Sequence, residues 1–518
     1  MASQPRCERL CRVTNNGFVA IDQGTSSTKG VLLDSELRVL ETVSIPVNLE
    51  SPQAGWVQQN AAQLWESVRD ALGTLQFKHP GMFADPAALP KLAITNQRES
   101  ALAWDPKSGQ PLSPMLGWQD RRTAERAEGM SAEQKARVRA LTGLPLDPMF
   151  SALKFEWILN QIDPDRSRSK AGELCLGTVD SWLVFKLTGE FRVEAGNASR
   201  TQLLDLATGD WSPELLDLFG IPAAALPRVC ASDEPTGPIT TDLGAQNGTA
   251  QNCTTQNPTR ITAVLADSHA ALYAHLVSEG TSVKATFGTG SSIMALASRL
   301  TAQEPNGLVK TLAWRLGSDT TLALEGNILS SGSTVVWLGD LLGKSPNELA
   351  EAATRAQLNP DKPVNLVPAF GGLGAPWWDT KARARIDGIT LATDVPTLAR
   401  AAFEAIVLQI EDVLEATENA IGAELNSVSV DGGPTSNGWL MQLQADLSQR
   451  RVTVAQIPEL SAYGVAALAA KNATASPATQ TTVTTIDYLP AIPAEQATTR
   501  RDSWHRAIDA TRGKANRN

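Results

Sequence analysis

Apolar and β-branched residues recur along the first part of the chain in short runs that are separated by turn signals. This pattern predicts three short strands, at residues 18–22, 30–34 and 38–45. Residues 60–76 then carry apolar side chains at helical spacing behind a suitable N-cap, Asn60, and residues 92–97 return to a strand pattern. Strands followed by a helix and a further strand indicate a sheet covered by helices, so we expect an α/β fold.

A second stretch of the chain repeats the plan of the first. Residues 20–34 and 284–298 both contain an apolar strand, a Gly-Thr turn followed by serines, and a second apolar strand. One such hairpin in each half of the chain favours an internal duplication.

Two further segments in the second half each combine a strand, an acid and a helix. The segment ITAVLADSHAALYAHL predicts a strand that ends at Asp267 and leads into a helix. The segment SVSVDGGPTSNGWLMQLQADL predicts a strand that ends at Asp431, a Gly-Gly turn, and a helix that begins near Ser436 or Asn437.

The length of the chain predicts two domains. With 518 residues it exceeds one ordinary hydrophobic core, and the cleft between two domains is a common place for a ligand. Residues 245–260 are polar and rich in Asn, Thr and Gln, which is typical of a boundary. We therefore expect a flexible lead-in at 1–16, one domain at 17–258 and another at 259–518.

Charge and cysteine content exclude several classes of protein. Forty-five basic and 55 acidic residues give a net charge of -10, which argues against a general binder of nucleic acid or anionic membranes. The apolar runs are too short to cross a membrane. Five cysteines form neither a disulfide framework nor a four-ligand zinc site, and Cys7 and Cys11 lack nearby partners for a metal, so a reducing cytoplasm is expected.

The hairpin turns contain residues suited to phosphate. Either Gly-Thr turn alone is compatible with a plain tight hairpin, but two hydroxyl-rich copies together with VDGG indicate nests of backbone N–H groups that bind anions. Asp22, at the mouth of the first turn, would hold Mg²⁺ through water, since Mg²⁺ prefers few carboxylates plus phosphate oxygens. The sequence lacks G-x-x-x-x-G-K-[ST], so it is not a P-loop enzyme.

Ordered motifs extend this interpretation over most of the chain, from Gly17 to about Lys471. They are DQGTSSTKG, PQAGWVQQN, ITNQRES, GWQDRRTAE, MFSALKFEWILNQ, GTVDSWLVFKLTGE, NASRTQLLDL, GTGSSIMAL, ALEGNI, PAFGGLGAPWWD and VDGGPTSNGWLMQ. With these motifs the chain resembles the FGGY carbohydrate kinase family, and most of all its glycerol kinase branch. The resemblance implies the actin-like ATPase superfamily: two ribonuclease H-like α/β domains that close around ATP and substrate at a cleft between them.

The resemblance also implies site residues on the acceptor side. Asp267 matches the general base that takes a proton from the attacking hydroxyl, although it could instead be a helix N-cap. Arg98 and Glu99 match substrate-binding residues, with a surface ion pair as the alternative. Trp118 matches an aromatic residue that packs on the carbon chain of glycerol, with a buried core tryptophan as the alternative.

On the ATP side the resemblance implies contacts from both hairpins and from the loops that follow. The matching positions are Thr25, Ser26, Ser27, Lys29, Thr289, Gly332, Gly433 and Asn437. His269 and His275, on the same predicted helix as Asp267, receive no role beyond contact or packing.

Several positions depart from the glycerol kinase pattern. Met149 stands where a tyrosine donates a hydrogen bond to glycerol, Ser268 where a glutamine follows the base, and Ser292 where a phenylalanine often packs on the substrate. Val336 replaces a glutamine on the adenine side and changes only nucleotide contacts. Losing one partner of a buried hydrogen bond costs about 1–3 kcal/mol, so three such changes predict a lower affinity for glycerol. The loss of bulk at Ser292 adds a second prediction, a wider and wetter acceptor pocket.

Alternative functions therefore stay open at this point. Because Arg98, Glu99, Trp118 and Asp267 are all kept, we expect phosphorylation of glycerol by ATP, with water filling the wider pocket. The alternative that the departures suggest is a longer polyol or a ketose such as erythritol, xylitol, xylulose or ribulose. An acceptor-independent actin-like ATPase or a silent regulatory protein is disfavoured by NQRES, GWQDRR and FEWILNQ. We also expect a homodimer or homotetramer by family, and no sugar bisphosphate inhibition, because TAQNCTTQNPTRIT replaces a Gly-rich segment.

Overall fold

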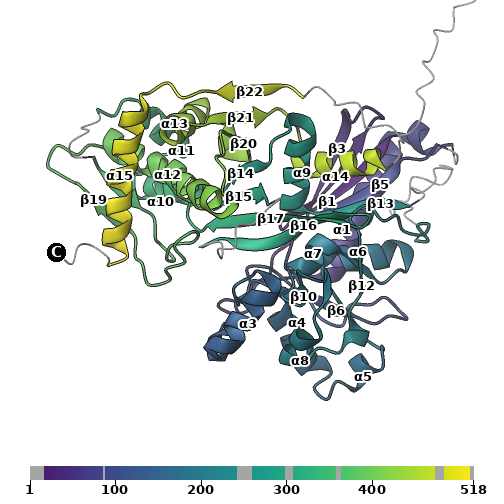
Figure 1. Ribbon diagram of the computed structural model, residues 1–518. Coiled ribbons are helices and arrows are strands. Elements are labelled where there is room, and N and C mark those ends of the chain that lie inside the picture. Colours follow the sequence, from purple (N-terminus) through teal and green to yellow (C-terminus); the bar gives the residue numbers. More distant parts are fainter. Residues whose placement is uncertain are drawn as a thin grey trace, which may run out of the picture.

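The computed structural model describes residues 17–85, 88–241, 260–297, 307–357, 363–472 and 483–513 (Figure 1). The lead-in with Cys7 and Cys11, and the predicted boundary at 258/259, lie outside the described residues. Within the ranges given, no helix is both long and apolar enough to cross a membrane.

The first of two large sheets is built around the predicted N-terminal hairpin. Its strand order is β13-β5-β1-β2-β3. The strands are β1 (Phe18–Gln23), β2 (Ser27–Leu33), β3 (Val39–Pro46), β5 (Lys91–Asn96) and β13 (Ile261–Ala266). β1 pairs antiparallel with β2 and parallel with β5, and β13 pairs parallel with β5.

The second sheet repeats this pairing, which confirms the predicted repeat of the hairpin. Its order is β16-β17-β15-β14-β20-β21-β22. β14 pairs antiparallel with β15 and parallel with β20, as β1 does with β2 and β5. The strands are β14 (Val283–Phe287), β15 (Ser291–Leu296), β16 (Val309–Leu316), β17 (Asp319–Ile328), β20 (Ser427–Asp431), β21 (Arg451–Ala455) and β22 (Thr485–Tyr488).

Helices cover both faces of the first sheet because its strands alternate apolar residues between them. Val19 and Ile21 of β1 join the core under α1 (Ala61–Lys78), whereas Ala20 joins the core formed with α9 (Asp267–Glu279) and α14 (Leu460–Lys471). The predicted helix cap is confirmed, since the Asn60 side chain accepts hydrogen bonds from the backbone N–H groups of Ala62 and Gln63.

The second sheet carries its own helical layer (Figure 1). These helices are α10 (Gly332–Leu342), α11 (Pro346–Thr354), α12 (Val395–Ile421), α13 (Gly438–Ser448) and α15 (Ala494–Thr511). α13 begins directly after Asn437, whose side chain caps it, so the predicted helix start is confirmed.

Smaller elements form the rest of the described chain. The helices are α2 (Ala124–Gly129), α3 (Ala132–Thr142), α4 (Ser151–Ile162), α5 (Ser167–Lys170), α6 (Val179–Thr188), α7 (Ala195–Ser199) and α8 (Pro213–Phe219), with 3₁₀ turns at Pro80–Phe83, Ala223–Ala225 and Gly433–Ser436. The short strands are β4 (Gln58–Gln59), β6 (Leu102–Trp104), β7 (Met115–Leu116), β8 (Cys175–Gly177), β9 (Arg192–Glu194), β10 (Leu204–Asp205), β11 (Asp210–Trp211), β12 (Arg228–Cys230), β18 (Asn365–Val367) and β19 (Arg385–Asp387).

Strand β13 differs from the predicted division of the chain. The prediction assigned residues 259–518 to the second domain, yet β13 belongs to the first sheet and all six of its residues are buried there. An apolar strand pattern does not specify which sheet supplies its neighbour. Asp267, the first residue of α9, therefore directly follows a strand of the first sheet.

Candidate active site

Asp267 lies where the ends of two parallel strands meet. It is the first residue of α9, and Ala266 rather than Asp267 is the N-cap. One carboxylate oxygen, Oδ1, accepts a 2.6 Å hydrogen bond from the backbone N–H of Ser268 and lies 3.3 Å from Arg98 Nε. Desolvation outweighs the positive charge of Arg98 and raises the pKa of Asp267. The carboxylate is thereby favoured as a proton acceptor.

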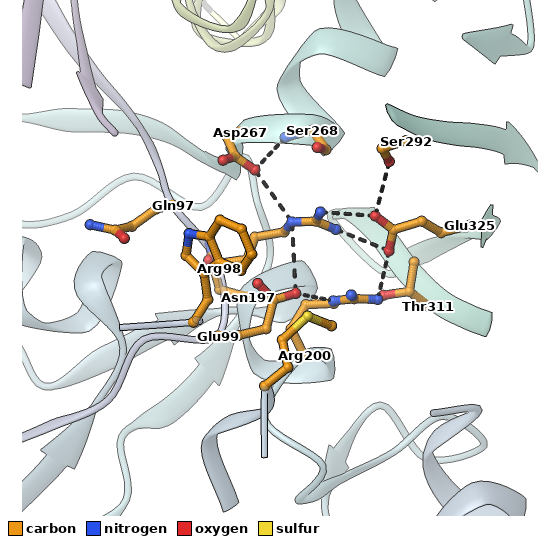
Figure 2. A network of polar contacts seen from close by, with 12 residues as sticks. Gln97, Arg98, Glu99, Asn197, Arg200, Asp267, Ser268, Ser292, Thr311 and Glu325 are labelled. Atoms are coloured by element: carbon orange, nitrogen blue, oxygen red, sulfur yellow. Dashed lines mark hydrogen bonds and ion pairs between the residues drawn. The ribbon is translucent and has the colours of Figure 1, made fainter. Parts of the chain in front are cut away.

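Glu99 is buried and Arg98 is largely buried, and both take part in a four-residue charge network, so they are not a surface ion pair. Arg98 donates hydrogen bonds of 3.2 and 2.8 Å to the two oxygens of Glu325 on β17. Arg200, which follows α7, donates a 2.7 Å bond to Glu99 and lies 2.9 Å from Glu325. Figure 2 shows these side chains converging beside Asp267. The network joins the first sheet to the second through β17.

The pKa of Glu325 lies far below its usual range. Burial opposes ionisation of this carboxyl group, but the positive charges of Arg200 and Arg98 outweigh that effect. Glu325 is therefore an anion at neutral pH, and the network holds two carboxylates against two guanidinium groups.

The residues that depart from the glycerol kinase pattern border this network. Ser292 Oγ donates a 3.2 Å hydrogen bond to Glu325, and Ser268 follows the carboxylate of Asp267 (Figure 2). Met149 is partly buried and packs beside Leu144. Trp118 is 38% exposed, and its Nε1 donates to Thr25 Oγ1 at 3.0 Å, so it is not a core residue.

The first hairpin brings Asp22 close to Lys29 and to the predicted base. Asp22 pairs with Lys29 across β1 and β2, and Lys29 Nζ lies 2.6 Å from Glu459 Oε2 before α14. Burial, followed by the negative charge of Asp267, raises the pKa of Asp22 to about 7. Mg²⁺ prefers few carboxylates together with water and phosphate oxygens, so the Asp22 carboxylate beside the hydroxyl-rich turn fits this ion.

A cavity of about 750 Å³ lies in the second half of the fold. The second-half residues predicted to bind ATP all line it: Thr289, Gly332, Gly433 and Asn437. Val336 lines it too, together with apolar residues of α10, α12 and α13. The other predicted ATP residues belong to the hairpin of the first sheet: Thr25, Ser26, Ser27 and Lys29. The predicted ATP residues therefore form two groups, one in each half of the fold.

Glycine is required where the backbone turns into this cavity. Gly432 has φ +98°, and a Cβ there would lie 2.0 Å from the carbonyl oxygen of Phe287. A Cβ on Gly332 would lie 2.6 Å from the carbonyl oxygen of Gly288. Both glycines allow the strand and helix ends to approach closely around the cavity.

Comparison with known proteins agrees with this architecture. Residues 18–272 match the N-terminal domain, and residues 283–473 the C-terminal domain, of the FGGY family of carbohydrate kinases. The chain belongs to the FGGY family. It is an ATP-dependent phosphotransferase that acts on an alcohol group, with the two-domain fold of the actin-like ATPases.

Relatives of this FGGY kinase act on more than one acceptor. A glycerol kinase of Burkholderia cenocepacia is 36% identical over 504 residues, which cover 96% of this chain and 98% of the relative. An apulose kinase of Pectobacterium atrosepticum is 39% identical over 463 residues, which cover 88% of this chain and 89% of the relative. The glycerol kinase of Plasmodium falciparum, solved with ADP, superposes with a TM-score of 0.87 at 26% identity. The superposition covers 96% of this chain and 98% of that structure.

Three charged residues of the FGGY kinase site escaped the sequence reasoning. They are Glu325, Arg200 and Lys154, and each lies inside one of the family motifs named above. A charged residue within such a motif is the sequence feature that could have identified them. Lys154 is fully buried, and its Nζ donates to the backbone carbonyl oxygens of Glu99 and Met149 at 3.0 and 2.6 Å. Desolvation lowers the pKa of Lys154 to about 7.

Proposed function

We propose that this kinase transfers the γ-phosphate of ATP to a hydroxyl group of a polyol or ketose longer than glycerol, of the erythritol, xylitol, xylulose or ribulose type. The main support for this proposal comes from Ser292, which stands at the position where glycerol kinases often have a phenylalanine. Its hydroxyl group donates a hydrogen bond to Glu325. A hydroxyl there both makes room and offers a hydrogen bond to an additional hydroxyl of the acceptor. The 39% identity to an apulose kinase supports the same direction.

In this proposal Asp267 accepts the proton of the attacking hydroxyl. Arg98 orients the Asp267 carboxylate from 3.3 Å, while Glu325 and Glu99 hold the Arg98 guanidinium in place. The acceptor would lie against Trp118, Met149 and Ser292. Phosphoryl transfer depends mainly on alignment and charge neutralisation, so this rigid network is suited to the step.

The nucleotide would extend from the cavity of the second domain to the first hairpin. Gly332, Gly433 and Asn437 would contact the nucleotide along the cavity. Thr289 of the second Gly-Thr turn, with Thr25, Ser26, Ser27 and Lys29 of the first hairpin, would contact its phosphates. Mg²⁺ would be held by Asp22 through water, where it would neutralise phosphate charge. Closure of an acceptor-side first domain on a nucleotide-side second domain would exclude water from the reaction.

Glycerol is the second candidate acceptor. Arg98, Glu99, Trp118 and Asp267, which match glycerol-binding positions, are all present, and the Burkholderia cenocepacia relative is a glycerol kinase. In that case water molecules would occupy the space beside Ser292.

Steady-state kinetics with a panel of acceptors separates the two candidates. Glycerol, erythritol, xylitol, ribulose and xylulose are compared at saturating ATP. We expect the highest kcat/KM with one of the longer compounds, and the highest value with glycerol would overturn the proposal in favour of the second candidate. A homodimer or homotetramer stays a prediction, which light scattering of the purified enzyme tests.

A further inference from the structure

His275 lies in the interior between two carboxylates from different elements. Its side chain on α9 is fully buried. Nδ1 lies 2.9 Å from Glu279 Oε1, one helical turn further along α9. Nε2 lies 3.2 Å from Asp431 Oδ2, at the end of β20. Because carboxylates accept hydrogen bonds, both ring nitrogens donate at once only in the imidazolium form.

The charges around His275 balance when it is protonated. Lys284 of β14 lies 3.9 Å from Asp431 and donates a 2.5 Å hydrogen bond to Thr286, and Ser429 of β20 donates to Glu279. Two carboxylates thus face one lysine and one imidazolium. Burial opposes the charged form of the imidazole, but the hydrogen bonds to Asp431 and Glu279 outweigh it and raise the pKa of His275.

This buried pair connects the predicted base to the nucleotide cavity. α9 begins at Asp267, and β20 ends at Asp431, directly before Gly432 and Gly433. Gly433 and Asn437 line the cavity of about 750 Å³. The His275–Asp431 contact is therefore a side-chain link between the base helix and the segment 432–437, which we call the nucleotide loop.

We propose that His275 is a positioning residue that holds the nucleotide loop in its binding conformation through Asp431. The inference rests on the proposed placement of the nucleotide in this cavity and is independent of the acceptor. When the imidazolium loses a proton, one of its two donated hydrogen bonds is lost and β20 is held less firmly. Nucleotide affinity then falls as the pH rises through the pKa of His275.

ADP binding measured calorimetrically from about pH 6 to about pH 9 tests this link. In the unmodified protein we expect the Kd for ADP to rise about tenfold over the range, since a hydrogen bond to a charged group is lost. His275→Gln should bind ADP about tenfold more weakly at low pH and show only the pH dependence that the titration of ADP itself contributes. His505→Gln is the matched control, because His505 also contacts a carboxylate, that of Asp412 at 2.9 Å, but lies on α15. It should keep the unmodified profile, including the titration of ADP itself.

A wild-type measurement keeps the proposal testable if His275→Gln fails to fold. The chain has four histidines, so NMR of protein with labelled histidine resolves a small set of titrations. Binding and protonation are reciprocally linked, so saturating ADP should raise the pKa of His275 by the logarithm of the Kd ratio between the two pH extremes. No shift in this pKa would overturn the proposal.

Val336→Trp tests separately whether the nucleotide binds in the cavity and whether His275 positions its loop. Val336 lines the cavity and is 49% exposed, so the larger side chain can be accommodated. We expect it to weaken ADP binding. Unchanged ADP affinity in Val336→Trp would mean that the nucleotide binds elsewhere, which overturns the cavity assignment and the inference together. Weaker binding in Val336→Trp with an unmodified pH profile in His275→Gln would overturn the role of His275 alone.

Discussion

At the residue scale, the candidate site contains one buried anion held between two guanidinium groups. Glu325 receives two hydrogen bonds from Arg98 and lies 2.9 Å from Arg200, and these charges stabilise its ionised form. Breaking a buried charge pair typically costs about 3–5 kcal/mol, so the network resists reorganisation when substrate binds. In the proposed site, the departures from the glycerol kinase pattern would therefore change the free space next to this network without moving it.

Replacing the predicted base should remove most of the activity. Asp267→Asn keeps the shape of the side chain but cannot accept the proton, and we expect kcat to fall by about 10²–10⁴. Asp217→Asn, an exposed residue of α8, makes the same chemical change away from the site and should retain normal activity. ADP release measured with the preferred acceptor checks both variants, and a near-normal rate for Asp267→Asn would refute its role as base.

Restoring the glycerol kinase residues should shift the acceptor preference. The double variant Met149→Tyr with Ser292→Phe adds a hydroxyl donor and fills the space beside Glu325. We expect kcat/KM to fall by about tenfold for the longer acceptor and to rise by a similar factor for glycerol, since one hydrogen bond or packed group contributes about 1–3 kcal/mol. The KM for ATP should not change. Equal effects on both acceptors would contradict a specificity role.

At the element scale, two small residues allow helices α9 and α14 to pack closely on the first sheet. A Cβ added at Gly464 of α14 would lie 1.9 Å from the carbonyl oxygen of Ala270 on α9. The chain returns through α14 from the second half to the first sheet, and α9 carries Asp267. The spacing of these two helices therefore affects the position of the base.

Gly464→Ala should push the two helices apart. Overpacking against a backbone atom costs about 1–3 kcal/mol, so we expect the free energy of unfolding and the Tm both to fall. Gly129→Ala, at the end of α2 where no atom lies within 4 Å of the added Cβ, should change stability by less than about 0.5 kcal/mol. Thermal and urea unfolding measure both, and a neutral effect of Gly464→Ala would show that α14 moves freely.

A titratable contact joins helices α12 and α15. The hydrogen bond from His505 to Asp412 raises the pKa of His505 in the folded protein above its value of about 6.5 in the unfolded chain. This contribution to stability is fully present below about pH 6.5 and is lost as the pH rises through the folded pKa. The Tm difference between the unmodified protein and His505→Gln should therefore shrink from about pH 5 to about pH 9. A difference that is constant or grows with pH would contradict this sign.

At the scale of the whole molecule, two sheets repeat the same hairpin pairing, and we propose that the turns of both hairpins bind phosphate. Arg98 at the end of β5 reaches Glu325 on the second sheet, and Lys29 on β2 reaches Glu459 before α14. These contacts connect the two halves of the fold beside Asp267 and beside the first hairpin. Closure around both substrates is expected to complete the site.

Acceptor-dependent turnover tests that picture. Without an acceptor we expect ADP release to be slow, because closure excludes water, and a preferred polyol or ketose should accelerate it by at least about 100-fold. ADP and acceptor together should raise the Tm more than either alone, because each ligand binds only the folded protein. Turnover that is independent of any acceptor would favour an actin-like ATPase, and no turnover with any acceptor a silent regulatory protein.

The local elements and the type of chemistry can be read from the order of the amino acids. The apolar alternation of β1 and β2, the cap at Asn60 and the Gly-Gly turn after Asp431 all follow from interactions within a few residues, so their patterns are readable. Motif order added the family, and with it Asp267, Arg98 and the two phosphate turns as candidates.

Only the tertiary structure decided which distant segments meet. It placed β13 beside β5 instead of in the second sheet, Arg200 and Glu325 on either side of Arg98, and His275 against Asp431. An apolar strand or a buried charge needs a neighbour, but its local pattern does not specify where along the chain that neighbour lies. The acceptor pocket and the link to the nucleotide loop both depend on such long-range pairings, which is why neither could be derived from the residues alone.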